Sequence, residues 1–280
     1  MRKYLLGIFI LLMFSKLAYA NTILVEENNF PAKIHFGIYS IFQASFYSRS
    51  YGPNGQIANA SGSDYQLNQE FYIGLQDQLV LRLVVPYYFS STSSNQMAST
   101  SGLFDLGVKL QYLIRPEQNT SPSTSVLLAG RFPNQNNQQG IGLPYGRLGA
   151  MAVFEKAMGK INSHLNLGYV YTFPYTDTAV VPQSQIDPGD TFQLNLAFEY
   201  PLQSLLDLSY EIIFQYDAND IINGVVSAGS EEKTLSHFLG LTRSLGGNSY
   251  LFGGVQIPLY IKKSSGLSAV VPSLGIYYEF

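Results

Sequence analysis

The chain has 280 residues, no cysteine and a formal net charge of −3 at pH 7. The slight negative charge argues against nucleic-acid binding, which needs a basic face. The lack of cysteine fits a protein of an oxidising compartment that uses no disulfides.

Residues 1–20 are typical of a cleaved secretory signal peptide. Arg2 and Lys3 give a basic start, a continuous apolar stretch follows, and a small-x-small cleavage site ends at Ala20. The apolar stretch is too short to cross a bilayer as a helix. We therefore expect one mature domain over residues 21–280, the alternative being a retained N-terminal anchor.

The rest of the chain is rich in apolar residues but has no long apolar run. Apolar residues make up 46% of the sequence, and 21 tyrosines and 18 phenylalanines are among its residues. No later segment approaches the ~18 consecutive apolar residues of a membrane helix. In such a chain apolar residues have to alternate with polar ones along the strands, as they do in transmembrane β-barrels.

Period-two alternation predicts about twelve strands, each near the ~9–11 residues that cross a bilayer at a tilt. In chain order they cover residues 33–50, 64–75, 79–90, 102–114, 123–132, 146–156, 161–173, 190–200, 205–216, 233–244, 249–260 and 268–280.

The connections between these strands tend to alternate in length. The long ones are 51–63, 91–101, 133–145, 174–189, 217–232 and 261–267, and the short ones are 76–78, 115–122, 157–160, 201–204 and 245–248. Bacterial barrels have short periplasmic turns and longer extracellular loops. The pattern predicts an all-β fold: a single transmembrane antiparallel up-and-down β-barrel of about 12 strands in the outer membrane of a Gram-negative cell. A soluble periplasmic β-protein is the alternative, but it would expose fewer aromatic faces.

The last strand ends on an aromatic residue. Its apolar face carries Leu274, Ile276, Tyr278 and Phe280. This resembles the closing strand of outer-membrane barrels, in which Tyr278 and Phe280 would form the assembly signal for the barrel-assembly machinery.

Several stretches also resemble one family in particular. They are Gly102 to Tyr112, Leu128 to Pro133, Leu165 to Tyr169 and the last hairpin from Gly240 to Phe280. Their sequence pattern is similar to that of outer-membrane channels named after a MetA pathway of phenol degradation. The resemblance implies an outer-membrane channel or uptake barrel for small aromatic compounds.

Alternation also assigns the residues expected to face the lumen. They are Tyr39, Tyr47, Glu70, Tyr72, Arg82, Tyr88, Asp105, Lys109, Arg131, Arg147, Glu155, His164, Glu199, Asp207, Glu211 and Tyr277, with Glu279. His237 and Phe238 interrupt the alternation of apolar and polar residues in their strand, so the sequence does not assign either side chain to the lumen or to the outer face.

Traced along the strands, these residues suggest a filter. Arg131 and Arg147 would form a cationic rim at the extracellular mouth, and five tyrosines on neighbouring strands an aromatic wall. Glu155, Glu199 and Asp207, with His164, would form an acidic floor. A small aromatic or amphipathic solute could stack on the tyrosines while its polar end meets the charges.

Three functions remain open at this point. The first is a porin-like transporter for passive uptake of small, aromatic or hydrophobic molecules. Because twelve strands lie between the ~8 of a filled barrel and the ~16–18 of an open one, the charges could also pair across a plugged interior. The protein would then be a surface scaffold, adhesin or receptor acting through its loops.

The third and least favoured function is a barrel-embedded hydrolase. Outer-membrane phospholipases carry a His-x-Ser arrangement, but residues 37, 166 and 239, two after each histidine, are not serine. The sequence shows no Cys/His cluster, phosphate loop or dinucleotide fingerprint. We expect no catalytic residue, metal or cofactor, and as partners the membrane lipid, the assembly machinery and a small-molecule solute.

Overall fold

The computed structural model describes residues 35–51, 57–91, 101–133, 141–177, 183–246, 249–262 and 266–280. The predicted signal peptide and the start of the mature chain lie outside these ranges. In the described ranges every regular element is a β-strand, and no helix is long and apolar enough to cross a membrane.

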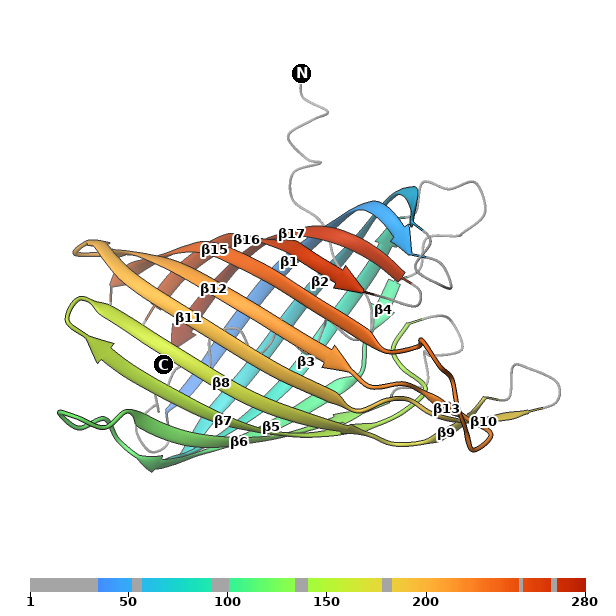
Figure 1. Ribbon diagram of the computed structural model, residues 1–280. Coiled ribbons are helices and arrows are strands. Elements are labelled where there is room, and N and C mark those ends of the chain that lie inside the picture. Colours follow the sequence, from blue (N-terminus) through green and yellow to red (C-terminus); the bar gives the residue numbers. More distant parts are fainter. Residues whose placement is uncertain are drawn as a thin grey trace, which may run out of the picture.

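The strands form a large sheet and a small one (Figure 1). The large sheet contains β1 (Phe36–Tyr51), β2 (Ile57–Gln76), β3 (Leu79–Ser91), β4 (Ser101–Leu103), β5 (Leu106–Arg115), β6 (Ser123–Phe132), β7 (Arg147–Met158), β8 (Ile161–Thr172), β11 (Thr191–Gln203), β12 (Leu206–Asp217), β15 (Glu232–Gly246), β16 (Ser249–Lys262) and β17 (Gly266–Glu279). The small sheet contains β9 (Tyr175–Asp177), β10 (Ser184–Asp187), β13 (Ile221–Ile222) and β14 (Val225–Val226).

The large sheet closes on itself as an antiparallel barrel. Its order is β2-β1-β17-β16-β15-β12-β11-β8-β7-β6-β5-β3, and the pairing of β2 with β3 closes the ring. The short β4 pairs with β3 beyond the end of β5 and so extends the position of β5 in the wall. The first and last strands are neighbours, and the N–H of Phe280 donates to the carbonyl of Phe36 over 2.8 Å. The predicted fold, a barrel of twelve antiparallel strands, is confirmed.

Most strand limits agree with the sequence prediction to within a few residues. The strand 123–132 has the predicted bounds, whereas β2 begins at Ile57, seven residues before the predicted 64. The predicted strand 102–114 is divided into β4 and β5 at Phe104 and Asp105, whose side chains are both buried.

The small sheet was not predicted, because its strands lie in segments assigned to loops. β13 and β14 form a two-residue hairpin at Asn223 and Gly224, whose φ angles are 50° and 79°. Asn-Gly is the preferred pair for such a turn, so a local signal for this hairpin was present in the loop 217–232.

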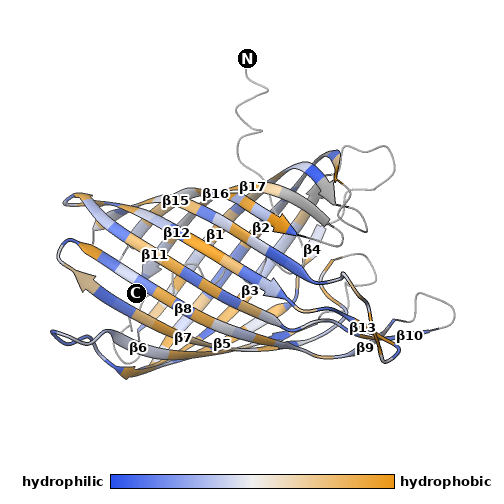
Figure 2. Cartoon of the chain, viewed as in Figure 1, coloured by the Kyte–Doolittle hydropathy of each residue, from blue (hydrophilic) through white to orange (hydrophobic). Residues whose placement is uncertain are grey.

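The barrel wall has a continuous apolar outer surface. On β11, Phe192, Phe198 and Tyr200 are 41%, 39% and 42% exposed, while Gln193 and Asn195 between them are buried. Figure 2 shows the resulting alternation of hydrophobic and hydrophilic residues along the tilted strands. Because side chains alternate across a strand, the exposed apolar side is the lipid-facing side and the buried side is the interior.

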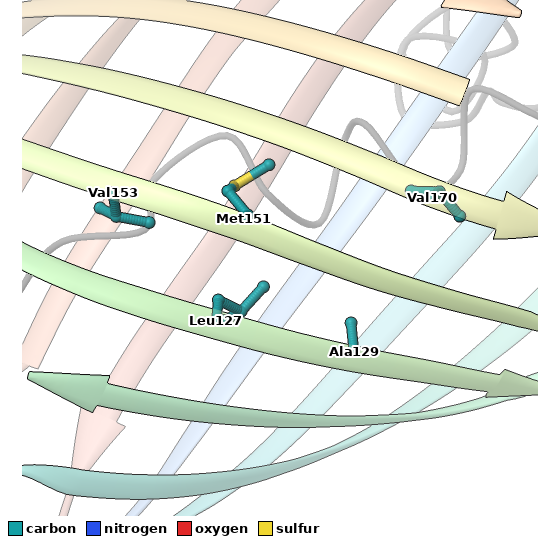
Figure 3. Packing of buried hydrophobic residues seen from close by; sticks show 5 residues of the cluster. All are labelled: Leu127, Ala129, Met151, Val153 and Val170. Atoms are coloured by element: carbon teal, nitrogen blue, oxygen red, sulfur yellow. The ribbon is translucent and has the colours of Figure 1, made fainter. Parts of the chain in front are cut away.

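The interior is not uniformly polar. Leu127, Ala129, Met151, Val153 and Val170, from three neighbouring strands, pack together on the buried side of β6, β7 and β8 (Figure 3). Part of the lumen wall is therefore an apolar patch, which the simple expectation of a hydrophilic inner face did not include.

One seam of the barrel is only half paired. β16 pairs with β17 from Ser249 opposite Tyr278 to Gln256 opposite Val271. Beyond that point the described residues 257–262 pair only with β15, and 266–270 pair only with β1. The β16–β17 ladder is thus open at the end of the barrel that carries the long loops.

Candidate functional site: the barrel interior

The two ends of the barrel differ in their connections, and we name them accordingly. The turn end holds the tight connections, such as β7–β8 and β11–β12, and the loop end holds the small sheet and the longer connections (Figure 1). In outer-membrane barrels short turns are periplasmic and long loops extracellular.

A buried charge cluster joins β2, β3 and β5. Lys109 Nζ lies 2.9 Å from Glu70 Oε1, and Arg82 Nη1 lies 3.8 Å from the same oxygen. Arg82 also donates a hydrogen bond to Gln111 and lies over the ring of Tyr72. Opposite charges buried together are stable only when paired in this way, so the three predicted residues form one cluster rather than separate filter charges.

A chain of polar side chains continues this cluster on β1 and β2. Tyr47 donates a hydrogen bond to Asp64, and Asn68 donates to Gln43 Oε1 over 3.0 Å. All four side chains are buried. Asp64 was not among the predicted lumen residues, although counting back in steps of two from the predicted Glu70 reaches it.

The mouth at the loop end is less cationic than predicted. Arg131 and Arg147 are direct cross-strand neighbours, as expected. However, Arg131 Nη2 lies 2.9 Å from Asp105 Oδ2, and its guanidinium lies 4.3 Å from the centroid of the Phe104 ring. Arg147 donates to the Tyr145 hydroxyl over 3.5 Å.

Residues 141–145, part of the predicted long connection 133–145, fold into this mouth. Ile141 is 1% exposed and packs with Tyr88, Phe104 and Val271. The N–H of Leu143 donates to Asp105 Oδ2 over 2.8 Å. The connection is where the sequence predicts it, but its burial was not anticipated. The three apolar residues in the stretch Ile-Gly-Leu-Pro-Tyr favour burial over exposure.

The aromatic wall is divided between the two ends. Near the turn end, Tyr72 and Tyr277 stack with ring centroids 5.4 Å apart, and Tyr250 stacks on Tyr277 at 5.8 Å. Tyr39 stacks on Phe252 at 5.0 Å. Tyr250 and Phe252 were missed, yet counting back in steps of two from Gln256 places both on the inner face.

The other two predicted tyrosines lie apart from this stack. Tyr47 is bound to Asp64, and Tyr88 belongs to the apolar cluster at the mouth. The turn-end stack is tied to the last strand, because Tyr277 donates to Glu279 Oε2 over 2.8 Å and His35 Nδ1 lies 3.0 Å from Glu279 Oε1.

Acidic side chains on the inner faces of β7, β11 and β12 gather around His164 of β8. His164 Nε2 lies 3.6 Å from Glu199 Oε2, and His164 Nδ1 lies 4.0 Å from Glu155 Oε2. Glu211 is 1% exposed, whereas Asp207 is exposed at the turn end.

The facing of His237 and Phe238, left open by the sequence, is set by the register. Phe238 lies opposite Glu211 and is buried, while His237 lies opposite Ile212 on the outer face. There His237 shares a hydrogen bond with Tyr210. In the described ranges no three His, Asp or Glu side chains are placed to hold a metal ion.

Comparisons with known proteins agree with this architecture. The family model described as "Putative MetA-pathway of phenol degradation" matches residues 50–262. The COG4313 outer-membrane channel of Pseudomonas putida F1 superposes with a TM-score of 0.74 at 15% identity, covering 91% of this chain and all (100%) of that one.

Two further outer-membrane barrels have weaker similarity. The translocator domain of the autotransporter NalP from Neisseria meningitidis has a TM-score of 0.56 at 12% identity over 94% of each chain. The NanC porin has a TM-score of 0.54 at 11% identity over 85% of this chain and 98% of that one. The search of curated proteins gave no match. The shared fold is that of an outer-membrane β-barrel.

Proposed function

Since the chain belongs to the MetA-pathway phenol-degradation family, whose model matches residues 50–262, we propose that it is an outer-membrane channel for passive uptake of small aromatic or apolar molecules. The observation that carries the proposal is the turn-end stack of Tyr72, Tyr277 and Tyr250 inside a closed barrel. Stacked aromatic faces bind planar solutes without requiring a particular set of hydrogen bonds.

The inner surface as a whole suits an amphipathic solute. The apolar patch of Leu127, Met151 and Val153 gives non-polar contact area, and the Asp105–Arg131 ion pair gives a polar wall in which the two charges offset each other. Charge pairs that neutralise each other would let an uncharged molecule pass without strong trapping.

The residues predicted to line the lumen remain assigned to that role within this proposal. The comparisons with outer-membrane channels give a hydrolase no support. The partners found for the three histidines are carboxylates and a tyrosine. We assign the exposed Tyr278 and Phe280 to recognition by the barrel-assembly machinery, and the apolar outer belt to contact with membrane lipid.

A plugged barrel that acts through its loops is the second candidate, and one observation favours it. Ile141, Leu143 and Tyr145 are buried in the mouth at the loop end. If this segment stays in place, it would narrow the path for solutes and leave the loops as the functional surface.

Planar-bilayer recording of the purified, detergent-folded protein separates the two candidates. A channel gives discrete current steps, and a small phenolic solute added to one side gives brief reductions of that current. A plugged scaffold gives no steps. Steps that phenolic solutes never interrupt would reject the aromatic specificity while retaining the channel.

A further inference from the structure

The inner face of the barrel is divided into two sectors of different charge balance. On β2 to β6 the carboxylates of Glu70 and Asp105 lie beside Lys109 and Arg131. By contrast, β8, β11 and β12 contain no lysine or arginine, and their inner faces carry four carboxylates: Glu199, Asp207, Glu211 and Asp217.

Two of these carboxylates, Asp217 and Glu211, are buried, and only Asp217 has hydrogen-bond donors for both of its oxygens. Asp217 accepts hydrogen bonds from Thr191 and Gln215. Glu211 is 1% exposed, and its Oε2 has no hydrogen-bond partner. His164 lies between Glu155 and Glu199, so even a protonated His164 gives one positive charge to this acidic group.

Amide side chains beside Glu211 also lack partners. Asn195 is 3% exposed and Gln193 is 1% exposed, and neither the nitrogen nor the oxygen of either side-chain amide has a hydrogen-bond partner. Asn195 lies on β11 two residues from Ala197, which is the register partner of both His164 and Glu211. Burying several polar groups without partners costs folding free energy, which a bound polar ligand would recover.

The turn-end aromatic stack extends from the wall opposite this acidic sector toward the acidic strands. In the closed order of twelve strands β2, which carries Tyr72, is six places from β11, whereas β17, which carries Tyr277, is three places from β12 and four from β11. Tyr277 and Tyr250 lie near the strand ends at Glu279 and Ser249, and Glu199 is four residues from the end of β11 at Gln203. Glu199 therefore lies in the turn-end half of the barrel with the stack, while Glu211, the sixth of the twelve residues of β12, lies midway between the two ends.

We infer that the lumen between the turn-end stack and the middle of β11 and β12 is a binding site for small aromatic amines. The aromatic ring packs against the turn-end stack, the ammonium group lies toward Glu199 and Glu211, and Asn195 hydrogen-bonds to a hydroxyl or to the ammonium. A cation balances the unpaired carboxylates, and cations are attracted to the tyrosine faces as well. This inference rests on the proposed channel function and adds a charge preference to it.

Three solutes of similar size and different charge test the preference. Tyramine is a cation at pH 7, 4-ethylphenol is neutral and 4-hydroxyphenylacetate is an anion. Each is added to the turn-end side of single channels in a planar bilayer, and the apparent dissociation constant is taken from the frequency and length of current blocks. Tyramine is expected to bind about tenfold more tightly than 4-ethylphenol, and the anion more weakly than either.

Variants then locate the effect. Glu211→Gln and, separately, Glu199→Gln should each reduce tyramine binding about tenfold and leave 4-ethylphenol binding unchanged. Glu231→Gln, a change in an exposed loop, is the matched control and should alter neither. Because each substitution keeps the side-chain size, heat-modifiable migration on a gel is expected to persist and shows that each variant is folded.

The possible results are distinguishable. Equal binding of tyramine and 4-ethylphenol, or a tyramine preference that survives both glutamate substitutions, overturns the amine site but leaves the channel. If none of the three solutes interrupts the wild-type current, the proposed aromatic specificity fails as well.

Discussion

Glycine at positions 240 and 254 makes room for Phe238 inside the barrel. The two glycines are register partners on β15 and β16. A Cβ added to Gly254 would lie 2.4 Å from the Phe238 ring and 2.6 Å from the carbonyl oxygen of Leu239. Since the second neighbour is backbone, it cannot move aside as a flexible side chain would.

Gly254→Leu is therefore expected to destabilise the folded barrel by about 1–3 kcal/mol. The measurement is urea unfolding in detergent, followed by the loss of heat-modifiable migration. Gly130→Ala is the matched control, because its Cβ would meet neighbours only at 3.5 Å and beyond. Equal midpoints for the two variants would contradict the assigned packing of Phe238.

Arg147 is the residue most able to set ion selectivity at the loop end. Arg131 is compensated by Asp105, whereas the described partner of Arg147 is the neutral Tyr145. Arg147→Glu should shift the reversal potential in a salt gradient toward cations.

The same substitution at Arg243, which shares the outer face of β15 with His237, serves as control and should leave the reversal potential unchanged. An unchanged potential in Arg147→Glu would show that the loop-end mouth does not determine selectivity.

At the scale of single elements, the turn after β5 is held by a charged contact. Lys156 Nζ donates to Glu117 Oε1 over 2.7 Å, and the N–H of Ala157 donates to the same carboxylate. The hydrogen bond from Lys156 is the main cause that lowers the pKa of Glu117 below its ordinary value.

A lowered folded-state pKa stabilises the protein above the unfolded pKa of a glutamate, about 4.3, and this stability is lost as the pH falls through the lowered value. Wild type should exceed Glu117→Gln in stability at pH 7, by a small margin because the pair is exposed. The margin should shrink as the pH falls below the unfolded value, because the glutamate then becomes protonated in both states. A margin that stays constant across this range would show that the carboxylate charge has no role.

The β16–β17 seam is the other element with a distinct prediction. Backbone amides that lack a ladder partner open and exchange more readily than paired ones, so the open end of this ladder should be the least protected part of the wall. Hydrogen exchange measured by mass spectrometry should show faster exchange for residues 257–262 than for 249–256, which are paired on both sides. Equal protection of the two halves would mean that the ladder is closed in the membrane.

Strand positions were predictable from sequence because alternation is a local, two-residue pattern. The same pattern places Glu70, Lys109 and Arg131 on one face without showing which of them meet. Ion pairing between β2 and β5 depends on register and on barrel curvature, which no local pattern contains. The inward fold of 141–145 was missed for a related reason: its apolar residues pack against strands far away in sequence, such as β3 and β17.

At the scale of the whole molecule, closure of the ring of strands determines that the buried faces of the strands enclose one common lumen. Because β2 pairs with β3 and β1 pairs with β17, the buried side of every strand faces the same interior. The apolar outer belt then meets lipid, and the polar, aromatic and charged side chains enclose the proposed path for solutes.

The most direct test of this account uses the natural absence of cysteine. Ser209, buried on the inner face of β12, and its neighbour Leu208 on the outer face are each replaced by cysteine in otherwise unchanged protein. A positively charged, water-soluble methanethiosulfonate reagent is then added during single-channel recording. If the buried side of β12 lines a conducting lumen, the current falls stepwise for Ser209→Cys and does not change for Leu208→Cys. A fall for Leu208→Cys alone, or no channel current in any variant, would contradict this account.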